Sequence, residues 1–198
     1  MNNEGYVKYR CERIDRPLAP FDYFAELNQC RTHLHELGLV GVYPDGIGYG
    51  NVSVREGATQ RFYISGSATG EIHTLDLHHY AHVTEFDMTR NWVKCEGSIQ
   101  ASSESMTHAA VYVALAEACT VLHVHHLGLW NQLLGNVPTT AAEVEYGTPE
   151  MAAEIGRLFR ETDVAERRII AMAGHREGLI TFGVSVREAM DALLTWFD

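Results

Sequence analysis

A helix-to-strand run in the middle of the chain constrains the fold more than any other segment. Residues 101–126 read ASSESMTHAAVYVALAEACTVLHVHH, with a helical stretch over 103–118 and a β-like run over 120–125. In a strand, residues two apart point to the same face, so His123 and His125 can aim both imidazoles at one point. This arrangement offers two neutral nitrogen ligands to one divalent metal.

Two further residues extend the metal-binding pattern. Glu104 lies one helix earlier, where its carboxylate can reach the same point and move a proton. His175, in the run AMAGHREGLITFG, also follows an apolar β-like stretch. Three histidines with an open fourth position are typical of a catalytic metal site, whereas structural zinc sites are closed and rich in cysteine. The sequence therefore predicts a divalent ion, zinc ahead of manganese or cobalt, on His123, His125 and His175.

Composition excludes several classes of protein. The chain has 198 residues, 46% of them hydrophobic, which predicts one globular domain with a substantial core. A net charge of −11 makes a nucleic-acid partner unexpected, because phosphate neutralisation needs a basic surface. The N-terminal segment has no apolar signal core and no run is long enough to span a membrane, so a cytoplasmic protein without a membrane partner is expected. The cysteines are scattered without a CxxC pair and are interpreted as reduced thiols: Cys11, Cys30, Cys95 and Cys119.

Hydrophobic periodicity predicts helices that alternate with strands. Helices are expected over residues 20–39, 103–118, 148–162 and 185–197, with a short helical LGLWNQLLG after the histidine pair. Strands are expected over NVSVRE, RFYISG, 80–88, 91–95, 120–125, 168–173 and 178–182. The predicted fold class is α/β, a single α/β/α domain over residues 1–198 with a central, largely antiparallel sheet. Residues 1–20 are predicted to be an N-terminal extension.

Six motifs in one order resemble the class II aldolase/adducin family. They are GIGYGNVSVR, FYISGSATG, SSE, HVH, YGTPEMA and GHREGLITFG, and together they cover roughly residues 21–197. The family, typified by fuculose-phosphate aldolase, is a set of metal-dependent lyases on a central-sheet α/β/α fold, often homotetrameric. It also includes decarboxylases, an epimerase, a dehydratase and adducin, a cytoskeletal protein in which the fold is not used for catalysis.

The resemblance implies a role for each motif. His123 and His125 match the metal pair, His175 matches the third ligand, and Glu104 matches the acid/base glutamate. Glycine lets backbone N–H groups approach a ligand closely, and serine hydroxyls at a helix start can complete an anion cradle. The residues matching the elements that hold a substrate phosphate are Gly50, Asn51, Ser65, Gly66, Ser102 and Ser103.

The expected chemistry passes through a metal-stabilised enediolate. A Lewis acid on the two oxygens of a hydroxy-ketone polarises its carbonyl, and Glu104 takes or returns the proton at the enediolate carbon. Aldol cleavage of a small hydroxy-carbonyl, such as a sugar phosphate, is the main expectation. Dehydration, decarboxylation, epimerisation, a non-catalytic adducin-like domain and a cupin-like metalloenzyme are the alternatives. The expected partners are the small-molecule substrate and further copies of the chain, in a homotetramer.

Two departures from the family pattern affect the expected reaction more than the expected metal site. The connection from His126 to Tyr146 is short and contains no tyrosine, although fuculose-phosphate aldolase-like members carry a tyrosine there that acts as an acid in the neighbouring active site. Tyr146 itself is the candidate replacement. Arg176 and Glu177 follow His175, where many members have glycine directly. Glu177 is expected in a surface turn, with the metal or the substrate as its alternative contact.

Overall fold

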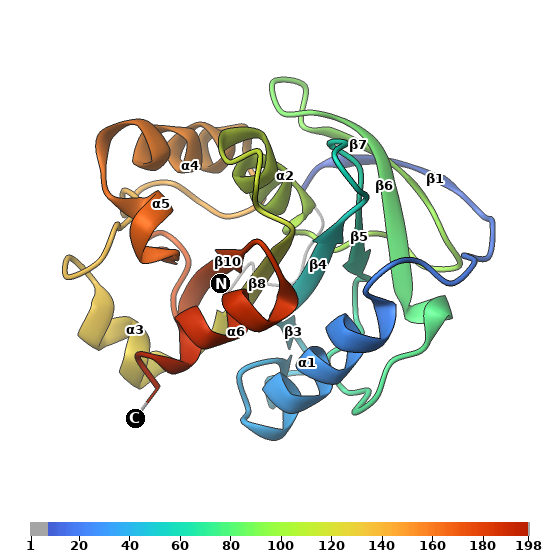
Figure 1. Cartoon of the computed structure of the whole chain (residues 1–198), viewed down its shortest axis with the longest axis horizontal. Coiled ribbons are helices and arrows are strands. Elements are labelled where there is room, and N and C mark those ends of the chain that lie inside the picture. The colour runs from blue at the N-terminus through green and yellow to red at the C-terminus, as the bar shows by residue number, and fades with distance from the viewer. Residues whose placement is uncertain (1–7, 198) are drawn as a thin grey trace.

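The computed structural model describes residues 8–197 and shows a large mixed sheet between two layers of helices (Figure 1). The first seven residues of the predicted N-terminal extension lie outside the described residues. In spatial order, the strands of the main sheet are β1 (Arg10–Ile14), β7 (Trp92–Glu96), β6 (Tyr80–Asp87), β5 (Phe62–Ser65), β4 (Asn51–Arg55), β8 (Thr120–His125), β10 (Gly178–Gly183) and β9 (Ile169–Ala171). A separate short pair joins β2 (Gly41–Val42) to β3 (Gly48–Tyr49).

Neighbouring strands of the main sheet are antiparallel except at one edge, where β1 and β7 are parallel. The predicted α/β fold with a central, largely antiparallel sheet is therefore confirmed. The helices also exclude the cupin-like alternative, which requires an almost all-β chain. They are α1 (Phe24–Glu36), η1 (Leu77–His79, a 3₁₀ turn), α2 (Ser105–Ala114), α3 (Leu127–Leu133), α4 (Pro149–Glu161), α5 (Val164–Arg167) and α6 (Val186–Leu194).

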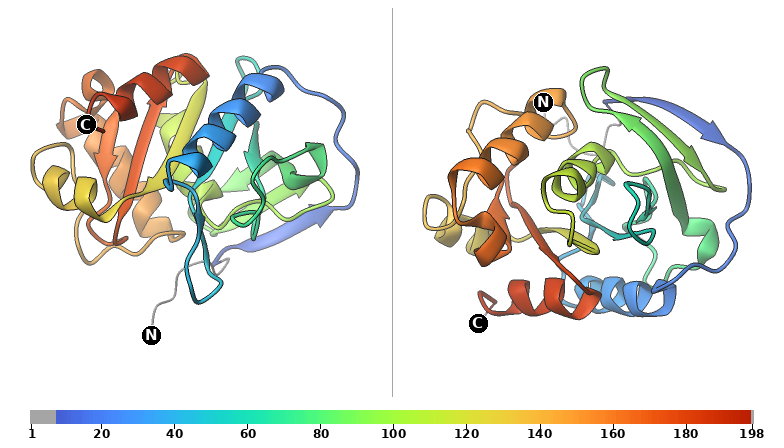
Figure 2. Two further views of the ribbon diagram at one scale, coloured as in Figure 1. Left: turned by 90° about the horizontal axis from the view of Figure 1, so that it is seen from below. Right: turned by 45° about the horizontal axis from the view of Figure 1, so that its top comes forward.

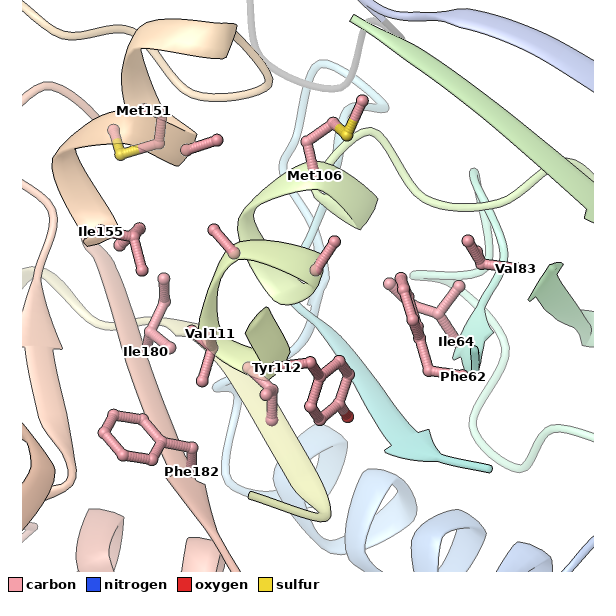
Figure 3. Close-up of a cluster of buried hydrophobic side chains, with 14 of the residues drawn as sticks. Phe62, Ile64, Val83, Met106, Val111, Tyr112, Met151, Ile155, Ile180 and Phe182 are labelled. Atoms are coloured by element: carbon pink, nitrogen blue, oxygen red, sulfur yellow. The ribbon is translucent and has the colours of Figure 1, made fainter. Parts of the chain in front are cut away.

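Helices cover both faces of the sheet, which explains why the central strands β4, β8 and β10 are buried at every residue. Figure 2 shows α1 and α6 side by side on one face, with α2 and α4 on the other. Figure 3 shows the core on the second face, where side chains of α2 and α4 meet those of the sheet. On β8, Val121 points into this core, whereas Leu122 and Val124 point into the core under α1 and α6. His123 and His125 share the parity of Val121 and so lie on the α2 face of the sheet.

Helix ends follow local side-chain chemistry. The hydroxyl of Thr148 accepts the backbone N–H of Met151, and Pro149 opens α4, as the sequence predicts. By contrast, α2 ends at Ala114 and does not continue to Ala118. The guanidinium of Arg55 donates to backbone carbonyls at the end of α2, which satisfies groups that a longer helix would have bonded internally.

The edge strand β1 was not predicted. Three of the five residues of its sequence, RCERI, are charged and exposed, so it carries little β propensity of its own. Parallel pairing with β7 supplies the hydrogen bonds that keep it extended. This strand lies within residues 1–20, so part of the predicted N-terminal extension belongs to the main sheet.

Candidate active site

Two of the three predicted metal ligands lie on β8, in the centre of the sheet. His123 on β8 lies between Asn51 of β4 and Ile180 of β10, and His125 lies beside Gly178. His175 is in the tight turn between β9 and β10, where its carbonyl accepts the backbone N–H of Gly178. All three histidine side chains are buried, with 1 to 5% of their surface exposed.

The three imidazoles converge on one point. Each offers a ligand nitrogen, and these atoms all lie within 4.8 Å of one another. The Nε2 atoms of His123 and His125 are buried without a hydrogen-bond partner among the described residues. Burial lowers the pKa of His123 to about 3 and holds the pKa of His125 and His175 well below the usual value, so the rings are neutral near pH 7. Neutral ring nitrogens that converge in this way fit a divalent cation.

Glu104 brings a carboxylate to the edge of this cluster. It is 2% exposed and immediately precedes the first turn of α2. Its Oε2 accepts a hydrogen bond from the hydroxyl of Thr107 at 2.7 Å, and its Oε1 lies 3.8 Å from Nδ1 of His175. Thr107, one helical turn away, fixes the carboxylate orientation. Sequence reasoning missed this contact, although the spacing of three residues within a helix would have allowed it.

A cavity of about 220 Å³ opens onto the histidines and Glu104. Its remaining walls are formed by residues 46–51, residues 66–70, residues 102–103 and Tyr146. Of the residues predicted to bind substrate, those that line the cavity are Gly50, Asn51, Gly66, Ser102 and Ser103. The hydroxyl of Ser65 lies elsewhere and accepts the backbone N–H of Val52.

Additional polar wall residues come from the same motif as Ser65. Ser67, Thr69 and Gly70 line the cavity, and the repeated hydroxyl residues in FYISGSATG were the available signal for them. Gly70 is required by packing, because a Cβ at this position would lie 2.0 Å from the carbonyl oxygen of Gly41. Glycine here lets the segment sit directly against β2.

Tyr146 closes the side of the cavity next to His175. Its ring stacks on the imidazole with 4.3 Å between centroids, and the Lys8 ammonium group lies 4.0 Å from the centroid of the tyrosine ring. Only 5% of Tyr146 is exposed. The geometry places a phenol beside the three histidines, and its role as an acid stays a prediction.

Comparisons with known proteins agree with this geometry. The class II aldolase and adducin N-terminal domain matches residues 26–196. The chain belongs to the class II aldolase and adducin family. Class II aldolases generally use a divalent metal, and the buried histidine cluster of this family member can hold one. The resemblance found in the sequence motifs is therefore confirmed.

Solved structures show the same family fold at low sequence identity. The L-fuculose-1-phosphate aldolase of Thermus thermophilus is 23% identical, with a TM-score of 0.61 over 87% of this chain and 88% of that chain. Another L-fuculose 1-phosphate aldolase is 18% identical, with a TM-score of 0.65 over 90% and 84% of the two chains. A sugar-phosphate aldolase of Thermotoga maritima is 15% identical, with a TM-score of 0.62 over 86% and 88%. No curated protein sequence matches this family member. Within residues 8–197, no helix is long and apolar enough to cross a bilayer.

Proposed function

We propose that the protein is a metal-dependent lyase that cleaves a small hydroxy-carbonyl compound, with a sugar phosphate as the substrate class. The observation that carries this proposal is the convergence of three buried neutral imidazoles beside the buried carboxylate of Glu104, at the base of a small polar cavity. A catalytic site needs a complete ligand set and an adjacent proton carrier. A non-catalytic, adducin-like domain needs neither.

The residues divide the chemistry between them. A divalent ion on His123, His125 and His175, zinc ahead of manganese or cobalt, would supply the Lewis acidity that polarises the substrate carbonyl. Glu104 moves the proton at the carbon next to that carbonyl, and Thr107 holds its carboxylate in place. Tyr146 is the candidate group for transferring the proton of the hydroxyl on the departing carbon. Dehydration, decarboxylation and epimerisation could use the same acid/base group, so the carbon–carbon lyase reaction is the finer part of the proposal.

The cavity walls support an anionic substrate end. The walls at Gly50, Asn51 and Gly66, with the hydroxyls of Ser102 and Ser103 just before α2, form the proposed phosphate cradle, and the predicted Ser65 is left out because it lies away from the cavity. The ten-residue helix α2 places its positive end at this point. Local N–H donors suit a chain whose net charge of −11 gives no long-range attraction to phosphate.

Proton exchange tests the function directly. The metal-loaded protein is incubated in deuterated water with dihydroxyacetone phosphate or with dihydroxyacetone, and loss of the carbon-bound proton is followed by NMR. We expect exchange, faster for the phosphorylated ketone, and its loss in Glu104→Gln by roughly two to four orders of magnitude with the metal retained. Exchange at the wild-type rate in Glu104→Gln would reject the assigned proton carrier. Equal rates for the two ketones would reject the phosphate cradle.

We further propose that the active protein is a symmetric homotetramer. In the resembling aldolases a tyrosine crosses a subunit boundary, and here Tyr146 ends the shortened connection near the cavity. Closed symmetry is the usual form of soluble homo-oligomers and places the same surfaces together in each copy. We also propose that the protein is cytoplasmic.

A further inference from the structure

The residue that interrupts the family pattern after His175 contacts the metal site through an intermediary. Glu177 occupies the turn between β9 and β10, as expected, but its side chain is only 19% exposed. Its Oε2 accepts a hydrogen bond from the hydroxyl of Tyr43 at 2.8 Å. The same hydroxyl lies 2.9 Å from Nδ1 of His125. The three side chains therefore form a continuous carboxylate–phenol–imidazole chain.

The donors and acceptors in this series of three side chains allow only one direction of hydrogen bonding. A carboxylate is an acceptor, so the single hydroxyl proton of Tyr43 points to Glu177. A lone pair of the phenol oxygen then faces His125, and Nδ1 of that ring must donate. The neutral imidazole consequently carries its proton on Nδ1 and keeps the lone pair on Nε2. This is the nitrogen that is buried without a hydrogen-bond partner in the described part of the chain.

Backbone geometry indicates that the glutamate side chain is used. Glu177 has a φ of 69°, in the left-handed region that glycine adopts most readily. A glycine would make the turn more easily, yet the position holds a side chain that reaches Tyr43. Tyr43 is itself held from the other side, because its ring packs against Tyr49 with 4.5 Å between centroids.

We infer that Tyr43 and Glu177 are positioning residues for the metal centre. They orient the ring of His125 and fix its tautomer, so that Nε2 is available to a divalent cation before one binds. Outer hydrogen-bond partners of this kind increase ligand basicity and remove the need for the ring to reorient. The inference rests on the proposed function, because it assumes that the three histidines hold a metal.

Metal affinity separates this role from simple packing. Purified wild type, Tyr43→Phe and Glu177→Gln are freed of metal, and the zinc dissociation constant is measured by chelator competition at one pH. The matched control is Tyr63→Phe, which removes a hydroxyl from β5, where the ring stacks between Phe21 and His82. We expect Tyr43→Phe and Glu177→Gln to weaken zinc binding by roughly 10- to 100-fold and the control to match wild type.

Two further variants test whether the turn stays folded and whether Tyr43 and Glu177 act through one hydrogen-bond chain. Glu177→Gly removes the carboxylate and leaves the residue best suited to a φ of 69°, so it preserves the turn while losing affinity like Glu177→Gln. The double variant Tyr43→Phe/Glu177→Gly should lose no more affinity than Tyr43→Phe alone, because each change removes one partner of the same hydrogen-bond chain. The visible absorption of bound cobalt should shift in the two single variants and stay unchanged in Tyr63→Phe.

The outcomes distinguish the inference from the function on which it rests. Wild-type protein that binds no divalent ion would overturn the metal centre and the positioning role together. Tight binding by wild type, with unchanged affinity and cobalt spectrum in Tyr43→Phe and Glu177→Gly, would overturn only the positioning role. Additive losses in the double variant would also contradict it, because they would show two independent effects.

Discussion

The guanidinium of Arg31 on α1 hydrogen-bonds to the segment that forms one wall of the cavity. Replacing Arg31 should therefore lower the stability of the protein by a measurable amount. Arg31 is 1% exposed. It donates to the carbonyl oxygens of Thr69 and His73 at 2.8 Å, to that of Gly70 at 3.4 Å, and to that of Ile72. Two of these acceptor residues, Thr69 and Gly70, line the cavity. These hydrogen bonds orient the carbonyl oxygens of this segment toward the buried guanidinium of Arg31.

The expected cost follows from these contacts. A hydrogen bond from a charged donor contributes about 1.5–3 kcal/mol to stability, and two of the bonds have good lengths. Relief of the desolvation penalty of the buried charge offsets part of that loss. Arg31→Met keeps the apolar stem and should therefore lower the free energy of unfolding by about 2–4 kcal/mol. For a chain of this size, such a loss corresponds to a melting temperature lower by roughly 4–16 °C.

Urea unfolding of the metal-free protein measures the loss, and Arg187→Met is the control. Arg187 also lies on a helix, but its side chain is 91% exposed, so its replacement should change stability by less than about 0.5 kcal/mol. Metal content should survive Arg31→Met, because the histidines lie on β8 and in the β9–β10 turn, whereas affinity for the phosphorylated ketone should fall. Equal stability of the Arg31 and Arg187 variants would refute the reasoning.

Three other predictions concern the pH dependence of stability, the proposed acid and the assembly. Burial holds the pKa of His108 and of the three predicted metal ligands below 6.5, so the unfolded chain binds more protons than the native one as the pH falls from 6.5 toward 3. The metal-free protein should lose about 1.4 kcal/mol per pH unit for each such imidazole, and equal urea midpoints at pH 7 and pH 5 would contradict this. Tyr146→Phe should keep its metal and lose turnover by about 100-fold, and full turnover would remove Tyr146 as the acid. Light scattering should give a tetramer, and an active monomer would exclude any contribution across a subunit boundary.

Local patterns predicted the centre of the fold well. The apolar run 120–125 forms β8 with the expected bounds, and its period of two places His123 and His125 on one face. Strand β1 could not be predicted in this way, because its extended form depends on pairing with β7 and not on its own residues.

The same distinction applies to the site. Glu104 and the histidine pair come from one continuous segment, so their proximity follows from a single helix–strand unit. Tyr43 and Arg31 could not be predicted, because their partners are distant in sequence. Tyr43 contacts a histidine 82 residues away, and Arg31 clamps a segment that begins 38 residues later. A tyrosine in a glycine-rich turn and an arginine on a helix carry no local signal of such partners.

The metal content of purified protein tests the central claim most directly. We expect elemental analysis to find about one divalent ion per chain in the wild type and in His33→Ala, whose exposed imidazole lies on α1. His123→Ala, His125→Ala and His175→Ala should each lose the ion while remaining folded by circular dichroism. Full occupancy in any of these three variants, or a wild-type protein that binds no divalent ion, would contradict the metal centre described here.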